Sequence, residues 1–94
     1  MARYKPKPYS TALCQPGSEF VFKMLDGREV GRAKSVADFV RILKIAPLSS
    51  VLYHANGGHF SPWLELMGEK ELAEKIKGIK GNDESLRKKI VQAL

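Results

Sequence analysis

This chain has few cysteines and histidines, and it has no acidic residue near its histidines, although catalytic and metal sites are commonly built from these residue types. The 94 residues include one cysteine, Cys14, and two histidines, His54 and His59, and no acid lies between Asp38 and Glu65. A single cysteine excludes an intramolecular disulfide and the multi-cysteine zinc frameworks. It is also the usual cysteine content of a protein in a reducing compartment. We therefore expect a cytoplasmic protein.

Long apolar runs are absent as well. The longest stretch without Asp, Glu, Lys or Arg, residues 45–64, is interrupted by two prolines and an Asn-Gly-Gly sequence. It therefore lacks the composition of a membrane span. The basic N-terminus is not followed by the apolar segment of a secretory signal. A chain of this length forms one domain with a single modest core.

A catalytic site is not predicted. Zinc needs three or four convergent ligands, and the two histidines and the cysteine do not stand at a known ligand spacing. A hydrolase needs a nucleophile, a base and an orienting acid, but the chain has no Gly-x-Ser-x-Gly motif and no catalytic-cysteine context. We expect no enzyme activity, cofactor or metal, and a small hydrolase or metal protein is a distant third alternative.

Positive charge is what the chain has in excess. Its formal net charge is +6, which favours a polyanionic partner. Residues 1–18 contain three cations, three prolines and no acid. Because proline favours extended geometry, we predict an extended basic arm over 1–18 and one compact domain over 19–94. A frayed terminus and a heat-adapted, Lys/Glu-rich surface are the alternative explanations.

A β-hairpin is predicted over residues 19–34. Apolar and other residues alternate from Phe20 to Leu25, and Asp26-Gly27 is a sequence that two-residue hairpin turns prefer. Gly31 weakens the returning strand. A two-stranded hairpin is not stable alone, so it must lie on helices.

Helical periodicity and end signals follow the hairpin. The N-caps that we predict are Ser35 for the first helix, Ser49 or Ser50 for a short second one, Ser61 for the third and Asn82 or Asp83 for the last; the predicted ends are Pro47, Asn56-Gly57-Gly58, Gly68 and Gly78. The predicted fold class is α+β, with an N-terminal β-hairpin packed on a small bundle of about four short helices. The predicted core comprises Phe20, Phe22, Phe39, Val40, Leu43, Leu52, Leu64, Leu72, Ile76, Leu86 and Ile90.

The segment "YHANGGHFSPWL", residues 53–64, has two interpretations. In the first, its aromatic residues are core anchors around a glycine turn, with His54 bonded to helix-terminal carbonyls and His59 to Ser61 or nearby backbone. In the second, it is an exposed partner-binding patch. Exposure of the Trp63 indole discriminates between them. The residues of this alternative patch are Tyr53, His54, His59, Phe60 and Trp63.

Basic residues form two groups in the sequence, and the first, which consists of Arg28, Arg32, Lys34, Arg41 and Lys44, has only Glu29 and Asp38 between its members. The second, from Lys75 to Lys89, has Glu71, Glu74 and Glu84 beside or within it. A Gly-x-x-Gly sequence at 78–81 is a weak match to a nucleic-acid clamp, and a helix end followed by an N-cap explains it equally well. The candidate nucleic-acid-binding residues are Arg3, Lys5, Lys7, Arg28, Arg32, Lys34, Arg41 and Lys44.

The order of motifs resembles an uncharacterised domain family of archaea and bacteria. The resemblance covers residues 20–94 and implies a compact, mainly helical domain of unknown function, without catalytic residues. The residues that carry it are Phe20, Phe22, Tyr53, His54, Phe60, Ser61, Trp63, Leu64, Leu72 and Ala73.

These observations predict a small, basic, non-enzymatic binding module. An accessory protein of nucleic acid or of a ribonucleoprotein is the leading function. A protein-interaction module that uses the patch at 53–63 is the alternative. We expect a monomer or weak dimer and no membrane association.

Overall fold

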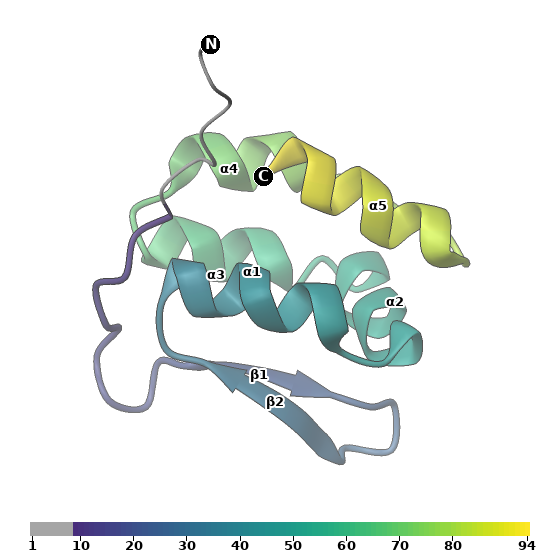
Figure 1. The fold of residues 1–94 in the computed structure, drawn as a ribbon, viewed down its shortest axis with the longest axis horizontal. Helices are drawn as coiled ribbons and strands as arrows, with labels where there is room; N and C mark the ends of the chain where they lie inside the picture. Colours follow the sequence, from purple (N-terminus) through teal and green to yellow (C-terminus); the bar gives the residue numbers. More distant parts are fainter. Residues whose placement is uncertain (1–8) are drawn as a thin grey trace, which may run out of the picture.

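The computed structural model describes residues 9–94, and Figure 1 shows their fold. The arm cations Arg3, Lys5 and Lys7 lie outside the described residues. The fold class is α+β as predicted, but this part of the chain contains five helices, one more than the bundle of about four. The elements are β1 (Phe20–Lys23), β2 (Glu29–Ala33), α1 (Val36–Ile45), α2 (Leu48–Asn56), α3 (Phe60–Leu66), α4 (Lys70–Ile76) and α5 (Glu84–Ala93).

The two strands form an antiparallel hairpin with one buried face. Phe20 pairs with Ala33 and Phe22 with Gly31 on that face. A Cβ atom at Gly31 would lie 2.8 Å from Cγ2 of Ile42, so glycine here permits the close approach of α1 to the sheet. Gly31, which we predicted to weaken β2, is therefore required for the packing of α1 on the sheet.

The hairpin loop differs from the predicted two-residue turn. The Met24 N–H donates to the carbonyl of Arg28 over 2.8 Å, and the Gly27 N–H donates to the carbonyl of Met24 over 2.9 Å. The loop therefore has three residues, with Gly27 at a φ of +89°. A glycine in this position is typical of three-residue hairpin loops.

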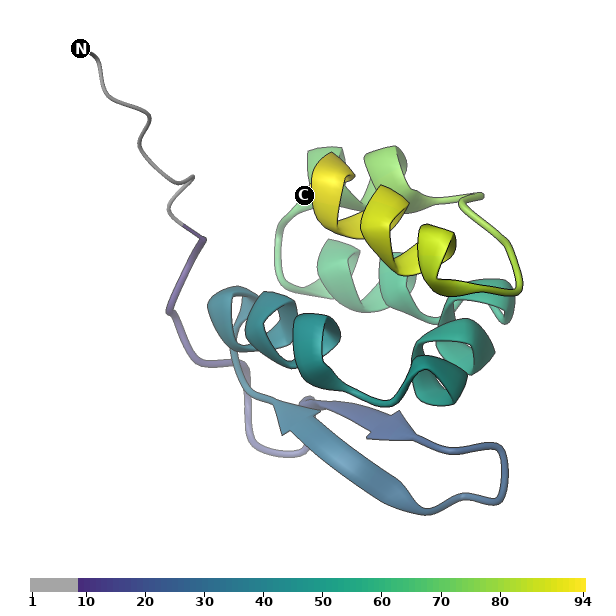
Figure 2. The same cartoon turned by 45° about the vertical axis from the view of Figure 1, so that its right-hand side comes forward.

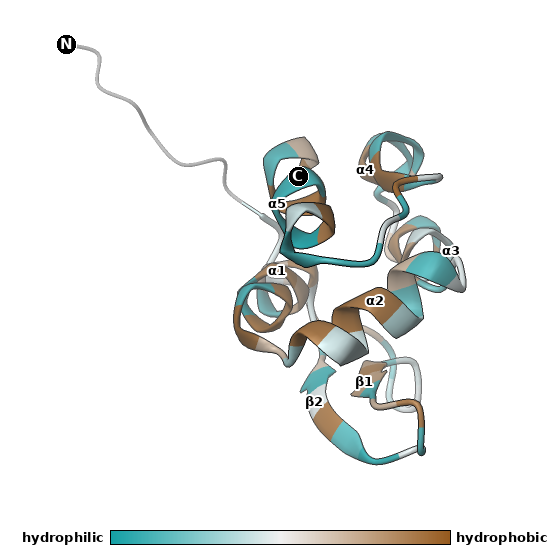
Figure 3. Ribbon diagram, turned by 90° about the vertical axis from the view of Figure 1, so that its right-hand side faces the viewer, coloured by the Kyte–Doolittle hydropathy of each residue, from teal (hydrophilic) through white to brown (hydrophobic). Residues whose placement is uncertain are grey.

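The helices are arranged around the hairpin in layers. Helices α1 and α2 cover its buried face, and α5 packs on the other side of these two helices. Helices α3 and α4 form an antiparallel pair beside them (Figures 1 and 2). Colouring by hydropathy shows apolar residues on the sides of the helices that face one another (Figure 3).

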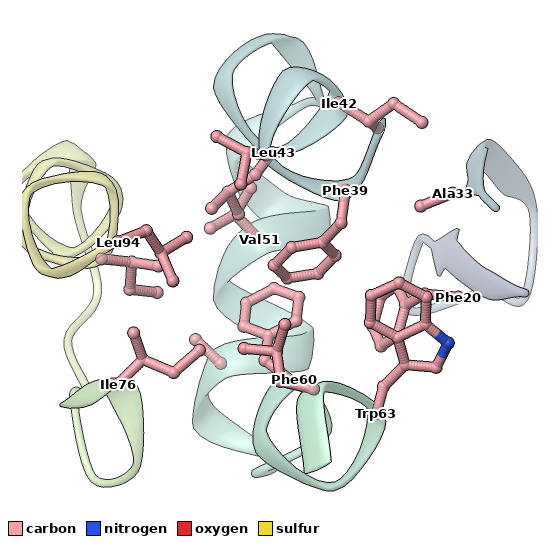
Figure 4. Close-up of a cluster of buried hydrophobic side chains, with 14 of the residues drawn as sticks. Phe20, Ala33, Phe39, Ile42, Leu43, Val51, Phe60, Trp63, Ile76 and Leu94 are labelled. Atoms are coloured by element: carbon pink, nitrogen blue, oxygen red, sulfur yellow. The ribbon is translucent and has the colours of Figure 1, made fainter. Parts of the chain in front are cut away.

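An aromatic cluster lies at the centre of the core (Figure 4). The ring of Phe39 is 5.5 Å from Phe20, 5.2 Å from Phe60 and 5.4 Å from Trp63, measured between centroids. Edge-to-face and tilted ring pairs at these distances are favourable beyond the area that they bury. All the predicted core residues are buried except Leu52, which is half-buried at the edge of the core.

Residues 9–18 contain no helix or strand, but hydrogen bonds join them to the domain. The Cys14 N–H donates to the carbonyl of Lys34 over 2.8 Å, and the Ala37 N–H donates to the carbonyl of Ser10 over 2.9 Å. Tyr9 packs against the core. The chain therefore passes from residue 9 to residue 14 beside the junction of β2 and α1.

Several helix ends follow the prediction. Ser35 accepts a hydrogen bond from the Asp38 N–H at the start of α1, and Asp83 accepts one from Ser85 N–H at the start of α5. Gly68 and Gly78 follow α3 and α4 with φ values of +85° and +91°. These positive angles are typical of the residue that follows a helix C-cap.

The predicted caps of α2 and α3 are wrong. Helix α2 begins after Pro47 and α3 after His59, and neither start has a side-chain cap. The Ser61 hydroxyl instead donates to the carbonyl of Ala73 over 2.9 Å, which ties α3 to α4. Ser50 is fully buried and bonds the hairpin. In both cases a tertiary partner uses the hydroxyl that the sequence assigned to a local cap.

Candidate functional site: the hinge between α2 and α3 and the basic surface

The end of α2 places the two histidines in contact. The Gly58 N–H donates to the carbonyl of Ala55 and the His59 N–H to that of His54. This bonding pattern, with Gly58 at a φ of +71°, brings the second residue after the cap over the last turn of the helix. The Nδ1 atoms of His54 and His59 are consequently 3.0 Å apart.

The hydrogen bonds of His54 define its protonation. His54 is only 5% exposed, and its Nε2 accepts the Lys23 N–H over 2.8 Å. The ring is therefore neutral with its proton on Nδ1, where it donates to Nδ1 of His59. Burial, then the charges of His59 and Lys23, lower the pKa of His54 to about 4. We predicted that His54 bonds helix carbonyls and that His59 bonds Ser61. The structure shows instead a series of hydrogen bonds from Lys23 to His54 and from His54 to His59.

Helix α2 satisfies both backbone groups of Lys23. The Ser50 hydroxyl donates to the Lys23 carbonyl over 2.9 Å, and His54, four residues along the same helix face, accepts its N–H. The hairpin register shifts between Phe22 and Lys23, although Lys23 still pairs with Glu29. Side chains of α2 thus bind the backbone of Lys23 at this irregular point of the sheet and fix the hairpin to the helices.

Loss of the Ser50 hydroxyl is expected to destabilise the fold. In Ser50→Ala the Lys23 carbonyl loses its partner in a partly buried site, so we expect a loss of about 1–2 kcal/mol in the free energy of unfolding. The matched control is Ser49→Ala, on the exposed side of α2, where the only hydroxyl bond is to the Met24 sulfur; it should change stability by less than about 0.5 kcal/mol. Urea unfolding measures both, and equal losses in the two variants would contradict the assignment.

The alternative patch at 53–63 is divided between core and surface. His54, Phe60 and Trp63 are buried, with Trp63 only 7% exposed. The indole Nε1–H donates to the carbonyl of Ser18 over 2.7 Å. Tyr53, which is 36% exposed, and His59 remain at the surface. The segment is therefore mainly a packing hinge, as in the first interpretation.

The arginines of the first basic group each lie beside an acid. Arg32 donates to both carboxylate oxygens of Glu29, over 3.0 and 2.7 Å, and Arg41 pairs with Asp38. These hydrogen bonds lower the pKa of each carboxyl. Arg28 lies 3.7 Å from Asp26 in the hairpin loop. These ion pairs were not predicted. A count of cations and acids along each segment does not show which side chains lie close together in space.

Lys34 and Lys44 are the members of this group that make no ion pair within residues 9–94. Lys34 lies between β2 and α1, and Lys44 lies on the exposed side of α1 near its end. Three of the sixteen cations and none of the ten acids fall in residues 1–8, which leaves thirteen cations against ten acids in the described part. Half of the net charge of +6 is therefore in those first eight residues.

Arg87, which the sequence placed in the second basic group, has a structural role. Its guanidinium donates to the carbonyls of Leu43 and Ala46 over 3.1 and 2.7 Å and bonds Glu84. The helical partner of the Leu43 carbonyl would be the amide of Pro47, which has no hydrogen. Pro47 is the sequence signal that a donor is needed, but nothing in the sequence identifies Arg87 as its source.

The Gly-x-x-Gly sequence at 78–81 is joined to α2. The Gly81 N–H donates to Oδ1 of Asn56 over 3.2 Å, and the Gly81 carbonyl accepts from Nδ2 of Asn56 over 2.8 Å. A phosphate clamp would need this amide to be open. The loop therefore fits the structural explanation of the motif.

Within residues 9–94, no group of three or more His, Cys, Asp or Glu side chains could hold a metal ion. In the same residues, no helix has the length and apolar character needed to cross a membrane. Comparison with protein-family models, curated proteins and solved structures finds no match to this chain.

Proposed function

We propose that this protein is a non-enzymatic binding module that holds RNA or DNA weakly and without strong base preference. The contacts would come from Arg3, Lys5 and Lys7 together with cations around the junction of β2 and α1. Phosphate contacts of this kind position a nucleic acid but carry no base information. The proposal assigns no catalytic residue and no cofactor.

The anchoring of residues 10–14 is the observation that supports this proposal most. The bond from Cys14 N–H to the Lys34 carbonyl, and that from Ala37 N–H to Ser10, fix the chain beside Lys34. Residues 10–14, which follow the segment that holds half of the net charge, therefore lie beside a lysine that has no ion pair within residues 9–94.

The paired arginines limit the strength of such binding. Exposed pairs such as Arg41 with Asp38 are worth at most about 1 kcal/mol, so a phosphate can compete for the guanidinium. Each acid nevertheless remains nearby and opposes the field of the cations. We therefore expect a dissociation constant on the order of micromolar or weaker at physiological salt, in the range of non-specific binding.

Binding should depend steeply on salt. If about four phosphates are neutralised, log K should fall with log salt at a slope of roughly −3 to −4 on duplex DNA, because each contact releases counterions. Replacing Arg3, Lys5 and Lys7 by glutamine should weaken binding and flatten the slope by about 2 to 3. Fluorescence anisotropy with labelled RNA and DNA between low and physiological salt measures both quantities.

A matched variant tests the position of the charges. Lys70, Lys75 and Lys89 to glutamine removes the same three charges from α4 and α5. This control should retain the larger part of the affinity and slope. Equal losses in the two triple variants would mean that only net charge matters, and absence of binding at low salt would leave the protein-interaction alternative, for which Tyr53 and His59 remain exposed.

A further inference from the structure

A groove lies between the hairpin loop and α2, away from the attachment point of residues 1–8. Its volume is about 550 Å³, within the range of small-ligand sites. Leu25, at the hairpin loop, is 83% exposed, and Tyr53 is 36% exposed. The groove is lined by Leu25, Ser49, Leu52, Tyr53, Asn56, Gly57 and His59.

The groove is unusual because its lining contains no acid, lysine or arginine. Charged residues make up 28% of the chain, yet no Asp, Glu, Lys or Arg lines the groove or lies in α2. Exposed large apolar side chains that gather around a groove mark a recognition surface more often than isolated ones do. The occupant that fits is therefore uncharged and flat or apolar where it enters.

Two aromatic rings give the groove a preference for a planar occupant. The rings of Tyr53 and His59 are 5.3 Å apart and at 78° to each other. A Cβ atom on Gly57 would lie 2.6 Å from Nε2 of His59, so only glycine leaves room for this position of the imidazole. The ring arrangement is thus built into the end of α2.

The hydrogen bonds between the two histidines also determine which nitrogen of His59 can carry its proton. Because the Lys23 N–H makes Nε2 of His54 an acceptor, Nδ1 of His54 must donate to Nδ1 of His59. A neutral His59 therefore carries its proton on Nε2, and this N–H has no acceptor within residues 9–94. The groove therefore combines the ring surfaces of Tyr53 and His59 with the aliphatic walls of Leu25 and Leu52.

We propose that this groove binds an unpaired nucleobase, so that the protein prefers single-stranded nucleic acid to duplex. The inference rests on the proposed function and specifies the form of nucleic acid. Unpaired bases are recognised by stacking on Tyr or His rings and by hydrogen bonds to their edges. A base within a duplex is stacked between its neighbours and paired along its edge, so its ring face is not available to such a groove.

Single-residue variants test this inference against a single-stranded RNA and a duplex of the same length. Tyr53→Ala should weaken binding to the single strand by about tenfold, as expected for loss of one stacking contact. Binding to the duplex should change by less than about twofold. Leu25→Ala should act in the same direction, whereas Ile45→Ala, an equally exposed aliphatic side chain at the end of α1, should have no effect.

A second measurement does not depend on the variants. Adding a short oligouridylate to the unmodified protein should shift the amide resonances of Gly57 and His59 in an NMR titration, together with those of the hairpin loop. The groove proposal would be wrong if the protein binds both nucleic acids and Tyr53→Ala reduces the two affinities equally or not at all. That result would leave the proposed function intact. No binding of either nucleic acid would overturn both. Groove resonances that respond to protein concentration alone would indicate self-association instead.

Discussion

Lowering the pH from 7 to 5 is expected to reduce the free energy of unfolding by about 2 kcal/mol, and a further decrease to pH 4 by about 1 kcal/mol more. The cause is His54, whose pKa is about 4 in the folded protein against an ordinary value of 6.5. Between these two values the unfolded chain binds a proton that the folded chain excludes, so acid favours unfolding. Stability from this group is complete above about pH 7 and is lost as the pH falls toward 4.

The environment of His54 accounts for the direction. Protonation would place a charge in a buried site and put a hydrogen on Nε2, where the Lys23 N–H is already directed. The ring also faces His59 and lies near the Lys23 ammonium, and both oppose a second positive charge. The carboxyls with lowered pKa, such as those of Glu29 and Asp38, titrate at lower pH and add to the loss only there.

Urea unfolding at pH 7, 6 and 5 tests this prediction. His54→Gln keeps an acceptor for the Lys23 N–H but removes the titration, so most of the loss between pH 7 and 5 should disappear. His59→Gln is the matched control, because it leaves His54 buried and should keep the larger part of the loss. An unchanged pH dependence in His54→Gln would show that another group controls acid unfolding.

Replacing Arg87 by alanine is expected to cost about 2–4 kcal/mol. The change removes two charge-assisted bonds to the carbonyls of Leu43 and Ala46, which end α1. These residues are buried, so water does not readily replace the guanidinium. The loss should also loosen the contact between α1 and α5, since Arg87 is the side chain that joins them by hydrogen bonds.

Thermal and urea unfolding compare Arg87→Ala with two other variants. Lys88→Ala, the next residue of α5 and an exposed one, should change stability by less than about 0.5 kcal/mol. Arg87→Lys should recover only part of the loss, because a single ammonium does not reproduce the geometry of the guanidinium fork. If Arg87→Ala and Lys88→Ala have the same free energy of unfolding, the bonds from Arg87 to the carbonyls contribute nothing measurable to stability.

The sequence predicted the features that depend on local patterns. Alternating apolar residues located the hairpin, and Ser35, Gly68 and Gly78 marked helix ends, because caps and turns involve residues a few positions apart. Ser50 and Ser61 were misassigned for the same reason. Their partners, Lys23 and Ala73, lie 27 and 12 residues away, and no local rule indicates a bond over such a separation.

The candidate sites were predicted less completely than the fold. The hinge interpretation of residues 53–64 followed from residue types, but the contact between His54 and His59 depends on the geometry of the end of α2. The groove beside Leu25 was not predicted, because the alternation of the strand shows only that Leu25 lies on the face opposite Phe20 and Phe22. Its exposure follows from the three-residue loop, which ends the strand pairing before Leu25.

The bonds from α2 to Lys23 also bear on how this protein avoids aggregation. A two-stranded hairpin offers unpaired N–H and C=O groups along each outer edge, and such edges recruit strands from other molecules. At Lys23 these groups are occupied by His54 and Ser50, so the edge of β1 is closed where its pairing with β2 is irregular. Protonation of His54 opens one of these groups. Acid should therefore promote intermolecular strand association at β1 under conditions in which most of the helices remain folded.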